Sequence, residues 1–240
     1  MTFSDPIITR PPPSSVTYNL SSPHQTIITL PPNSSWTSGL HWHSTHTEYL
    51  LLLRGSIHLR LNSVSKTLSA LADGSGVEVT IPQGARHEWE RADAGKGEEG
   101  DGEEVLVIER TDPNDGEKSL FFWNLNGVVM VAAQKGTESR IGLRRLVEKA
   151  WMMLSLLRIF WELDNWPVFL DLGGMVQGFT YGGLLLRLAY RVEWIVAHLI
   201  LGAASALGKV FGMKAVRKEM TPKALWNEWE SRRANGGKTS

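Results

Sequence analysis

The chain of 240 residues contains no cysteine. Without thiol groups it forms no disulfide, offers no thiolate ligand to a metal and has no cysteine nucleophile. This composition fits a reducing compartment. Residues 1–6 lack a basic segment followed by an apolar run, so we expect no secretory signal and a cytoplasmic location.

Net charge is also lacking, because 25 Lys and Arg balance 25 Asp and Glu. The charge is distributed unevenly between the two parts of the chain. Residues 1–140 contain 11 Lys and Arg against 17 Asp and Glu, whereas residues 141–240 contain 14 against 8. The sequence has no dense basic block with interleaved aromatic residues, so nucleic acid is excluded as a partner.

No hydrophobic run is long enough to favour a bilayer crossing. Residues 183–212 are a predicted helix, and their longest uncharged stretch, Trp194–Gly208, has 15 residues. A crossing needs about 20. We expect this helix to pack on the rest of the chain or on a second copy in a homodimer. Peripheral contact with a membrane surface is the second option and spanning the third.

The sequence does contain a dense group of metal-ligand residues. His41 and His43 are two residues apart, so on a strand they share one face and can bind a single ion. Glu48 has the opposite parity, and a turn at Ser44 and Thr45 is needed to bring it to the same side.

A fourth ligand is expected at His87. Residues 77–81 alternate apolar and polar side chains as a strand does, and Pro82 and Gly84 then form a turn that leads to His87. Three imidazoles and a carboxylate suit one divalent metal ion. We place iron first, with manganese, zinc, nickel or copper as alternatives, because these ligands do not select among them.

These residues resemble the two motifs of the cupin superfamily. In the first motif His-x-His is followed by Glu and, after six intervening residues, by Gly; in the second, Gly and Pro-x-Gly precede a histidine. The matching residues are His41, His43, Glu48 and Gly55, then Gly76, Pro82, Gly84 and His87. Ser35 and Arg91 depart from the motifs, where the family has Gly and Asn. These two departures lie at strand ends and do not affect the predicted ligands.

The resemblance implies a mainly β protein with a jelly-roll-like cupin barrel. We assign residues 1–15 to a flexible arm, 16–133 to the barrel and 140–235 to a helical extension. Several short strand patterns separated by turns support a barrel independently. Leu120–Trp123 and Val128–Val131 are expected to close it. Beyond them, apolar residues recur at helical spacing over residues 143–163, and Thr221 with Pro222 marks the start of a last helix.

Strand parity also suggests the residues around the metal. Leu50 and Leu52 share a face with Glu48, while Trp89 and Arg91 share one with His87, so these four are expected to line a substrate pocket. Glu48 and His46 are expected to move protons. His46 can alternatively bind the metal or face solvent. For His58 the sequence does not decide between an interior and an outward face.

A resemblance in overall plan to small cupins of filamentous fungi implies an oxidoreductase that tailors polyketides in secondary metabolism. The apolar wall of the predicted pocket suits a hydrophobic small-molecule substrate. Two alternatives stay open at this point. One is a metal-assisted cyclase, isomerase or dehydratase without redox chemistry, and the other is a barrel that binds a small molecule without turnover.

Overall fold

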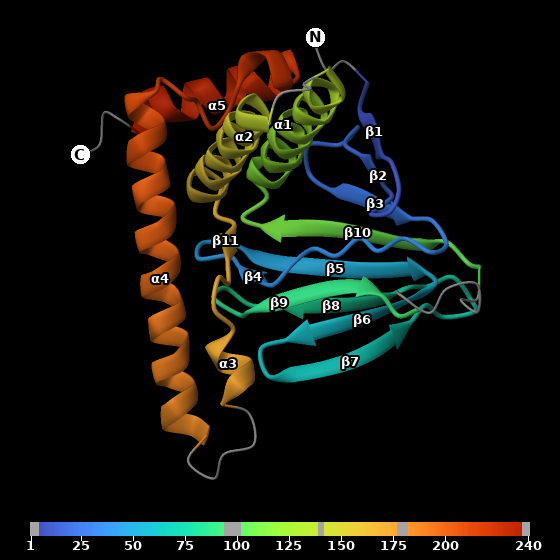
Figure 1. Cartoon of the computed structure of the whole chain (residues 1–240). Coiled ribbons are helices and arrows are strands. Elements are labelled where there is room, and N and C mark those ends of the chain that lie inside the picture. Colours follow the sequence, from blue (N-terminus) through green and yellow to red (C-terminus); the bar gives the residue numbers. More distant parts are fainter. Residues whose placement is uncertain (1–4, 94–101, 139–141, 177–181, 237–240) are drawn as a thin grey trace.

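The computed structural model describes residues 5–93, 102–138, 142–176 and 182–236, which form two antiparallel sheets and a set of helices (Figure 1). One sheet has six strands in the order β1-β2-β3-β10-β5-β8, and the other has five in the order β11-β4-β9-β6-β7. The strands of the first sheet are β1 (Ile7–Arg10), β2 (Val16–Asn19), β3 (Thr26–Leu30), β5 (Thr47–Arg54), β8 (Val77–Ile81) and β10 (Val105–Asp112). Those of the second are β4 (His41–Trp42), β6 (Ser56–Leu61), β7 (Val64–Ser69), β9 (His87–Arg91) and β11 (Trp166–Pro167).

The strands follow the alternation of the sequence. In β5 the side chains of Glu48, Leu50 and Leu52 are buried, while their neighbours are partly exposed. Val105 and Val107 of β10 face the same core. The expected mainly β fold, with helices toward the C-terminus, is thus confirmed.

Gly55 makes the turn by which the chain passes from β5 of the first sheet to β6 of the second. Its φ is +74°, a left-handed conformation that side chains disfavour. A Cβ at this position would lie 2.8 Å from Val105 Cγ2 and 2.9 Å from the carbonyl oxygen of Glu104. Glycine is therefore required for two separate reasons, one of conformation and one of space.

Helices cover one end and one side of the sheets (Figure 1). Helix α4 runs lengthwise beside the sheets and α3, while α1, α2 and α5 gather at one end of the molecule. Their bounds are α1 (Glu117–Glu138), α2 (Gly142–Glu162), α3 (Leu172–Met175), α4 (Gly182–Val210) and α5 (Lys223–Gly236), with a 3₁₀ turn at Lys218–Met220. The three helices expected after residue 140 correspond to α2, α4 and α5.

One strand prediction was wrong, because Leu120–Trp123 and Val128–Val131 lie within helix α1. Most of α1 is covered on several sides by the sheet, α2 and the 3₁₀ turn, so even the four consecutive side chains of 120–123 are buried. A helix enclosed in this way has no polar stripe, so its sequence shows the same continuous apolar run as a buried strand. The helix begins where the Asp115 carboxylate accepts a hydrogen bond from the Glu117 amide.

The expected domain boundaries also need correction. Residues 7–10 are not a loose arm, because they pair with β2 and bury Ile8 in the core. The C-terminal helices share the core of the sheets, to which Ile159, Met220 and Leu225 contribute. The division near residue 133 therefore does not separate two cores.

The short strand β11 joins the C-terminal half to the sheet that carries the predicted ligands. Trp166 pairs with Trp42 and Pro167 with His41 in β4. The two tryptophan rings stack with centroids 6.3 Å apart. Among the described helices, none is both long enough and apolar enough to cross a membrane.

Replacing Gly55 by alanine should destabilise the fold by about 2–3 kcal/mol, through left-handed strain and the Cβ clash together. Gly74→Ala is the matched control, because Gly74 has a φ of +75° but open space around its Cα. It should cost only about 1 kcal/mol. Urea denaturation measures both values, and equal losses in the two variants would contradict the argument.

Candidate metal centre

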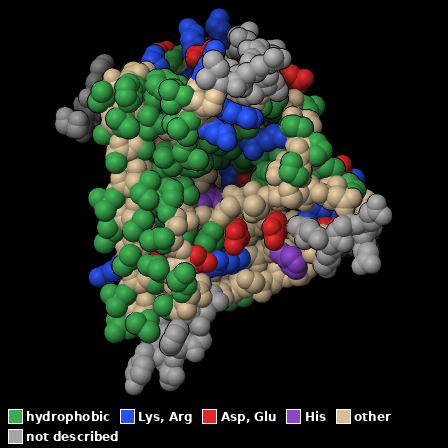
Figure 2. Space-filling view, in the orientation of Figure 1, with side chains coloured by type: hydrophobic (Ala, Val, Ile, Leu, Met, Phe, Trp, Pro, Cys, Tyr) green, Lys and Arg blue, Asp and Glu red, His purple; other side chains and the backbone are tan. Residues whose placement is uncertain are grey.

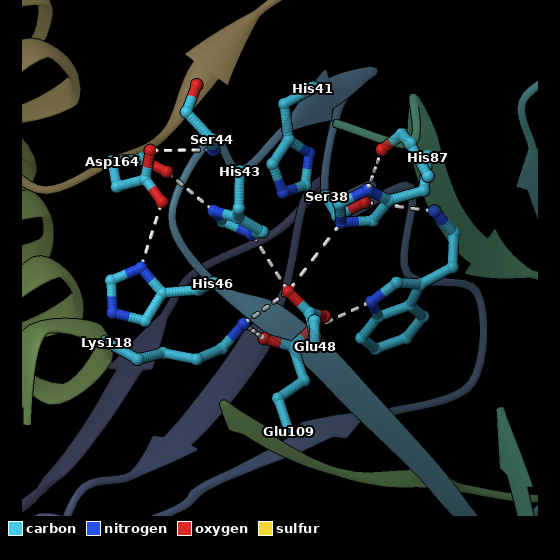
Figure 3. A network of polar contacts seen from close by, with 12 residues as sticks. Ser38, His41, His43, Ser44, His46, Glu48, His87, Glu109, Lys118 and Asp164 are labelled. Carbon is cyan, nitrogen blue, oxygen red and sulfur yellow. Dashed lines mark hydrogen bonds and ion pairs between the residues drawn. The ribbon is translucent and has the colours of Figure 1, made fainter. Parts of the chain in front are cut away.

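The four predicted ligands come together in space. His41 lies on β4 and is the register partner of His87 on β9, His43 follows β4 directly, and Glu48 lies on β5 of the other sheet. One ligand atom from each of the four lies within 4.8 Å of the others. Figure 3 shows the three imidazoles grouped on one side of the Glu48 carboxylate.

Backbone carbonyls fix the tautomer of all three histidines. The Nδ1 atoms of His41, His43 and His87 lie 2.7, 2.6 and 3.0 Å from the carbonyl oxygens of Gly39, Asp164 and Ala85. A carbonyl oxygen only accepts, so each Nδ1 carries the proton. In the neutral rings the lone pairs are then on Nε2, which is the arrangement found in metal-ligating histidines.

The charge states suit a cation as well. Burial lowers the pKa of His41 well below its usual 6.5, and the neighbouring imidazoles add to this effect. Burial alone would raise the pKa of Glu48, but the positive charge of the Lys118 ammonium holds it well below its usual value. The cluster therefore offers a neutral imidazole and an ionised carboxylate.

The arrangement of acceptors indicates what is needed between them. His43 Nε2 lies 2.9 Å and His87 Nε2 3.6 Å from the same oxygen of Glu48. Because the protons are on Nδ1, each of these Nε2 atoms directs a lone pair at the lone pairs of the carboxylate oxygen, and the two atoms repel. His87 Nε2 is buried and has no hydrogen-bond partner among the described residues. A divalent ion at this point would satisfy all four groups, so the residues fit a metal.

Lys118 and Glu109 complete the charge network, and the sequence did not indicate either of them. The Lys118 ammonium lies 2.7 Å from Glu48 Oε2 and 2.8 Å from Glu109 Oε2 (Figure 3). Trp89 Nε1 donates to the other oxygen of Glu109 at 2.8 Å. Lys118 comes from the first turn of α1, the segment whose helical state was not predicted, so its approach to Glu48 was not foreseen.

Asp164, at the end of α2, holds the loop between His43 and Glu48. Its carboxylate accepts from the amides of Ser44 and Thr45, both at 2.8 Å, and its carbonyl accepts from His43 Nδ1. The loop is the turn expected at Ser44 and Thr45. No local sequence signal links it to a residue about 120 positions later, so the role of Asp164 was missed.

His46 is built into this network instead of facing solvent. Burial would lower its pKa, but hydrogen bonds to Asp115 and Asp164 outweigh burial and raise it to about 9. At neutral pH His46 is therefore an imidazolium between two carboxylates, with no lone pair for a metal or for a proton. This arrangement favours a structural role over the expected catalytic one. His58 is exposed, and its ring contacts Thr67 Oγ1 at 2.9 Å.

A cavity of about 210 Å³ adjoins the centre and is lined by His41, His43 and Lys118. Its apolar wall differs from the one predicted. The aromatic and aliphatic side chains in the wall are Tyr18, Trp36, Phe121, Phe122, Leu125, Phe160 and Leu163. Figure 2 shows a hollow on this face, between the helical side and the sheets, with histidine inside it.

The four expected pocket residues lie elsewhere. Leu50, Leu52 and Trp89 are completely buried in the core, and none of them lines the cavity wall formed by the described residues. Arg91 is buried too, where it donates to the Leu30 carbonyl and pairs with Asp93. They share strand faces with the ligands, but those faces are filled by packed side chains. The open space lies instead where α1 and α2 cover the ligands.

Comparisons with known proteins find partial matches among solved structures. No family model and no curated protein matches this chain. Matched solved structures include a cupin 2 domain-containing protein from Halorhodospira halophila, with 17% identity and TM-score 0.28 over 36% of this chain and 50% of that one. Another is the capsular polysaccharide assembling protein CapF from Staphylococcus aureus, with 24% identity and TM-score 0.33 over 45% of this chain and 31% of CapF.

KdgF from Halomonas sp. also matches, with 16% identity and TM-score 0.32 over 46% of this chain and 92% of its own. The chain thus matches only half of the Halorhodospira protein and less than a third of CapF. At these scores the likeness carries no information on activity. The sheets, helices and ligand cluster define a mainly β fold of two antiparallel sheets with a candidate metal centre.

Replacing His87 by alanine should remove bound metal, because it deletes a ligand whose Nε2 has no other partner. We expect a loss of affinity beyond the roughly 10- to 100-fold that outer-sphere partners usually cost. His58→Ala, an exposed histidine, is the control and should retain metal. Elemental analysis after dialysis measures the metal per chain, and equal content in wild type and His87→Ala would exclude this centre.

Glu117 should make stability fall as pH rises. Burial and the nearby Asp115 raise its pKa to about 7 from the usual 4.5. Between these values the folded chain keeps a proton that the unfolded chain has lost, so the free energy of unfolding decreases with pH across this window.

Glu117→Gln should therefore be more stable than wild type above pH ~7, by on the order of 1–2 kcal/mol after allowance for solvent screening. Below pH ~4.5 the two proteins should be alike. Glu228→Gln, on an exposed position of α5, should show no such window. Denaturation at several pH values measures the free energy of unfolding of each protein. A difference in this free energy between wild type and Glu117→Gln that does not change with pH would disprove the assignment.

Proposed function

We propose that the chain is a metal-dependent oxidoreductase that tailors a hydrophobic small molecule, such as a polyketide in fungal secondary metabolism. One observation carries the proposal: three imidazole Nε2 atoms and an ionised carboxylate converge beside a cavity with an aromatic wall. A redox-active metal held by four protein ligands keeps coordination positions for substrate and oxygen.

The cavity supports the kind of substrate. Tyr18, Trp36, Phe121 and Phe122 contribute aromatic surface, and apolar binding sites of this sort recognise ligands through shape and buried area. Because α1 and α2 supply much of the wall, a bound molecule would be enclosed between the helices and the sheet. Enclosure excludes water from the reacting groups.

The chain's own charged groups have separate tasks. Glu48 is a ligand, and the two contacts of Lys118 hold its carboxylate in place. Lys118 lines the cavity, so its ammonium can also donate a hydrogen bond to a substrate oxygen that gains negative charge. Glu109 balances that ammonium and is itself held by Trp89.

Lys118 also favours one alternative, a metal-assisted isomerase, cyclase or dehydratase. An ammonium beside a metal suits an enolate, whose oxygen both cations stabilise, and such a reaction needs no oxidant. Oxygen consumption separates the two functions directly.

Iron-loaded protein prepared without oxygen should bind nitric oxide at an open coordination position. We expect the electron paramagnetic resonance signal of a high-spin iron–nitrosyl complex, and its absence in His87→Ala. A panel of aromatic polyketides is then tested in an oxygen electrode. Product formation with stoichiometric oxygen uptake is expected, whereas equal turnover under argon would transfer the assignment to the non-redox alternative.

A further inference from the structure

Arg10 is a cation in the cavity wall, and although Glu109 and Glu117 line the same cavity, no carboxylate of the described residues forms an ion pair with it. It is the last residue of β1 and lines the same cavity as His41 and His43. Its Nε donates to Asn126 Oδ1 at 2.8 Å, and its guanidinium lies 5.3 Å from the centroid of the Tyr18 ring. Its Nη2 is buried and has no hydrogen-bond partner in the described part of the chain.

The contrast with Lys118 makes this feature specific. Both cations line the cavity, but Lys118 is held between Glu48 and Glu109. Arg10 has a neutral amide and an aromatic ring as its neighbours. A guanidinium with unused donors in an enclosed site is costly unless an anion pairs with it.

We propose that Arg10 binds a carboxylate of the substrate, whose apolar body lies against the aromatic wall. The planar fork of a guanidinium matches a carboxylate with two parallel hydrogen bonds. The inference rests on the proposed function in so far as the cavity is the substrate site. It names the substrate class as an aromatic or apolar carboxylic acid.

The test compares 2-naphthoate with the uncharged 2-naphthamide by isothermal titration calorimetry. We expect metal-loaded wild type to bind the acid more tightly, and Arg10→Gln to weaken acid binding roughly tenfold while leaving the amide unchanged. Arg10→Lys, which keeps the charge but not the fork, should fall between. Arg54→Gln removes an exposed arginine that pairs with Glu104 and is the matched control.

The same titrations in His43→Ala separate this inference from the proposed function. If binding of the acid to the metal-deficient variant still depends on Arg10, the carboxylate site is supported independently of the metal. Acid binding that is lost in His43→Ala but unchanged in Arg10→Gln would place the carboxylate on the metal and overturn the inference. No preference for the acid, or no binding of either probe to folded wild type, would also overturn it.

A second and independent feature is the apolar outer face of α4. Large hydrophobic side chains recur along it at helical spacing and are exposed, namely Leu184, Leu188, Val192, Ile195, Leu199, Leu207 and Val210. Figure 2 shows hydrophobic side chains over much of the side formed by α4. At the end of the helix, Phe211 contacts the exposed Trp151 of α2, with ring centroids 6.0 Å apart, so the face continues onto α2.

The exposed charges of α4 are all positive. Arg187, Arg191 and Lys209 border the apolar face, whereas the acidic residue of the helix, Glu193, is buried and bound to Arg86. A helix with an apolar face and a cationic border suits a surface of anionic lipid. If two copies of the chain paired through α4, the arginines and the lysine of one helix would lie against those of the other. This repulsion disfavours a second copy of the chain as the partner of this face.

We infer that α4 lies along the interface of an anionic phospholipid membrane without crossing it. Contiguous exposed apolar patches mark surfaces that contact a protein or a membrane. The absence of a membrane-spanning helix among those described is compatible with contact from one side.

Sedimentation with vesicles tests this inference. We expect the protein to bind vesicles of phosphatidylcholine with phosphatidylserine, more weakly at high salt, and little to phosphatidylcholine alone. Leu188→Gln with Leu199→Gln should abolish binding to both. Arg187→Gln with Arg191→Gln should weaken binding to the anionic vesicles on the order of tenfold, at about 1 kcal/mol per charge.

Leu71→Gln, an exposed leucine away from α4, should bind as wild type does. Light scattering on the same samples reports the oligomeric state. A stable dimer that is disrupted by the α4 substitutions and does not bind vesicles would overturn the inference in favour of a self-association surface. Absence of binding by a monomer would overturn it as well.

Discussion

The cluster of acceptors around Glu48 is the constraint on which the rest of the site depends. Imidazole Nε2 lone pairs from the second sheet and a carboxylate oxygen from the first face one another in a buried space, and groups of this kind repel unless a positive charge lies among them. The chain supplies one such charge itself, the ammonium of Lys118. Packing of α1 on the sheet is therefore an electrostatic requirement of the ligand cluster as well as a hydrophobic one.

The C-terminal half belongs to the site for the same reason. Asp164 follows α2 directly and holds both the loop after His43 and the ring of His43. Its φ of +45° aims the carbonyl and the carboxylate at the same loop. The helices thus do more than cover the sheet, because they orient a ligand and supply much of the cavity wall.

The ligands were predictable because they depend on local geometry. Strand parity places His41 and His43 together, and Pro82 with Gly84 makes the turn that leads to His87. Most strands and the last three long helices followed from the same kind of periodicity. The state of α1 was not predictable in this way, because a helix buried on several sides has no polar stripe.

That single error explains most of what the sequence reading missed. With Leu120–Trp123 and Val128–Val131 assigned to strands, the approach of Lys118 to Glu48 was not foreseen, and strand parity placed the pocket at Leu50, Leu52, Trp89 and Arg91. Asp164 was missed for a different reason. Its contacts with Ser44 and His46 span about 120 positions, and only the tertiary fold brings them together.

The uneven charge of the two halves has a structural meaning. Three acidic residues of the first half, Glu48, Glu109 and Asp115, lie at or near the candidate metal centre, where they pair with Lys118 and His46. Basic residues of the second half border the exposed face of α4. A neutral chain is therefore divided into an acidic interior site and a cationic outer surface. Because Glu48, Glu109 and Asp115 each pair with a cationic side chain, their negative charges add little to the electrostatic field at the exposed face of α4.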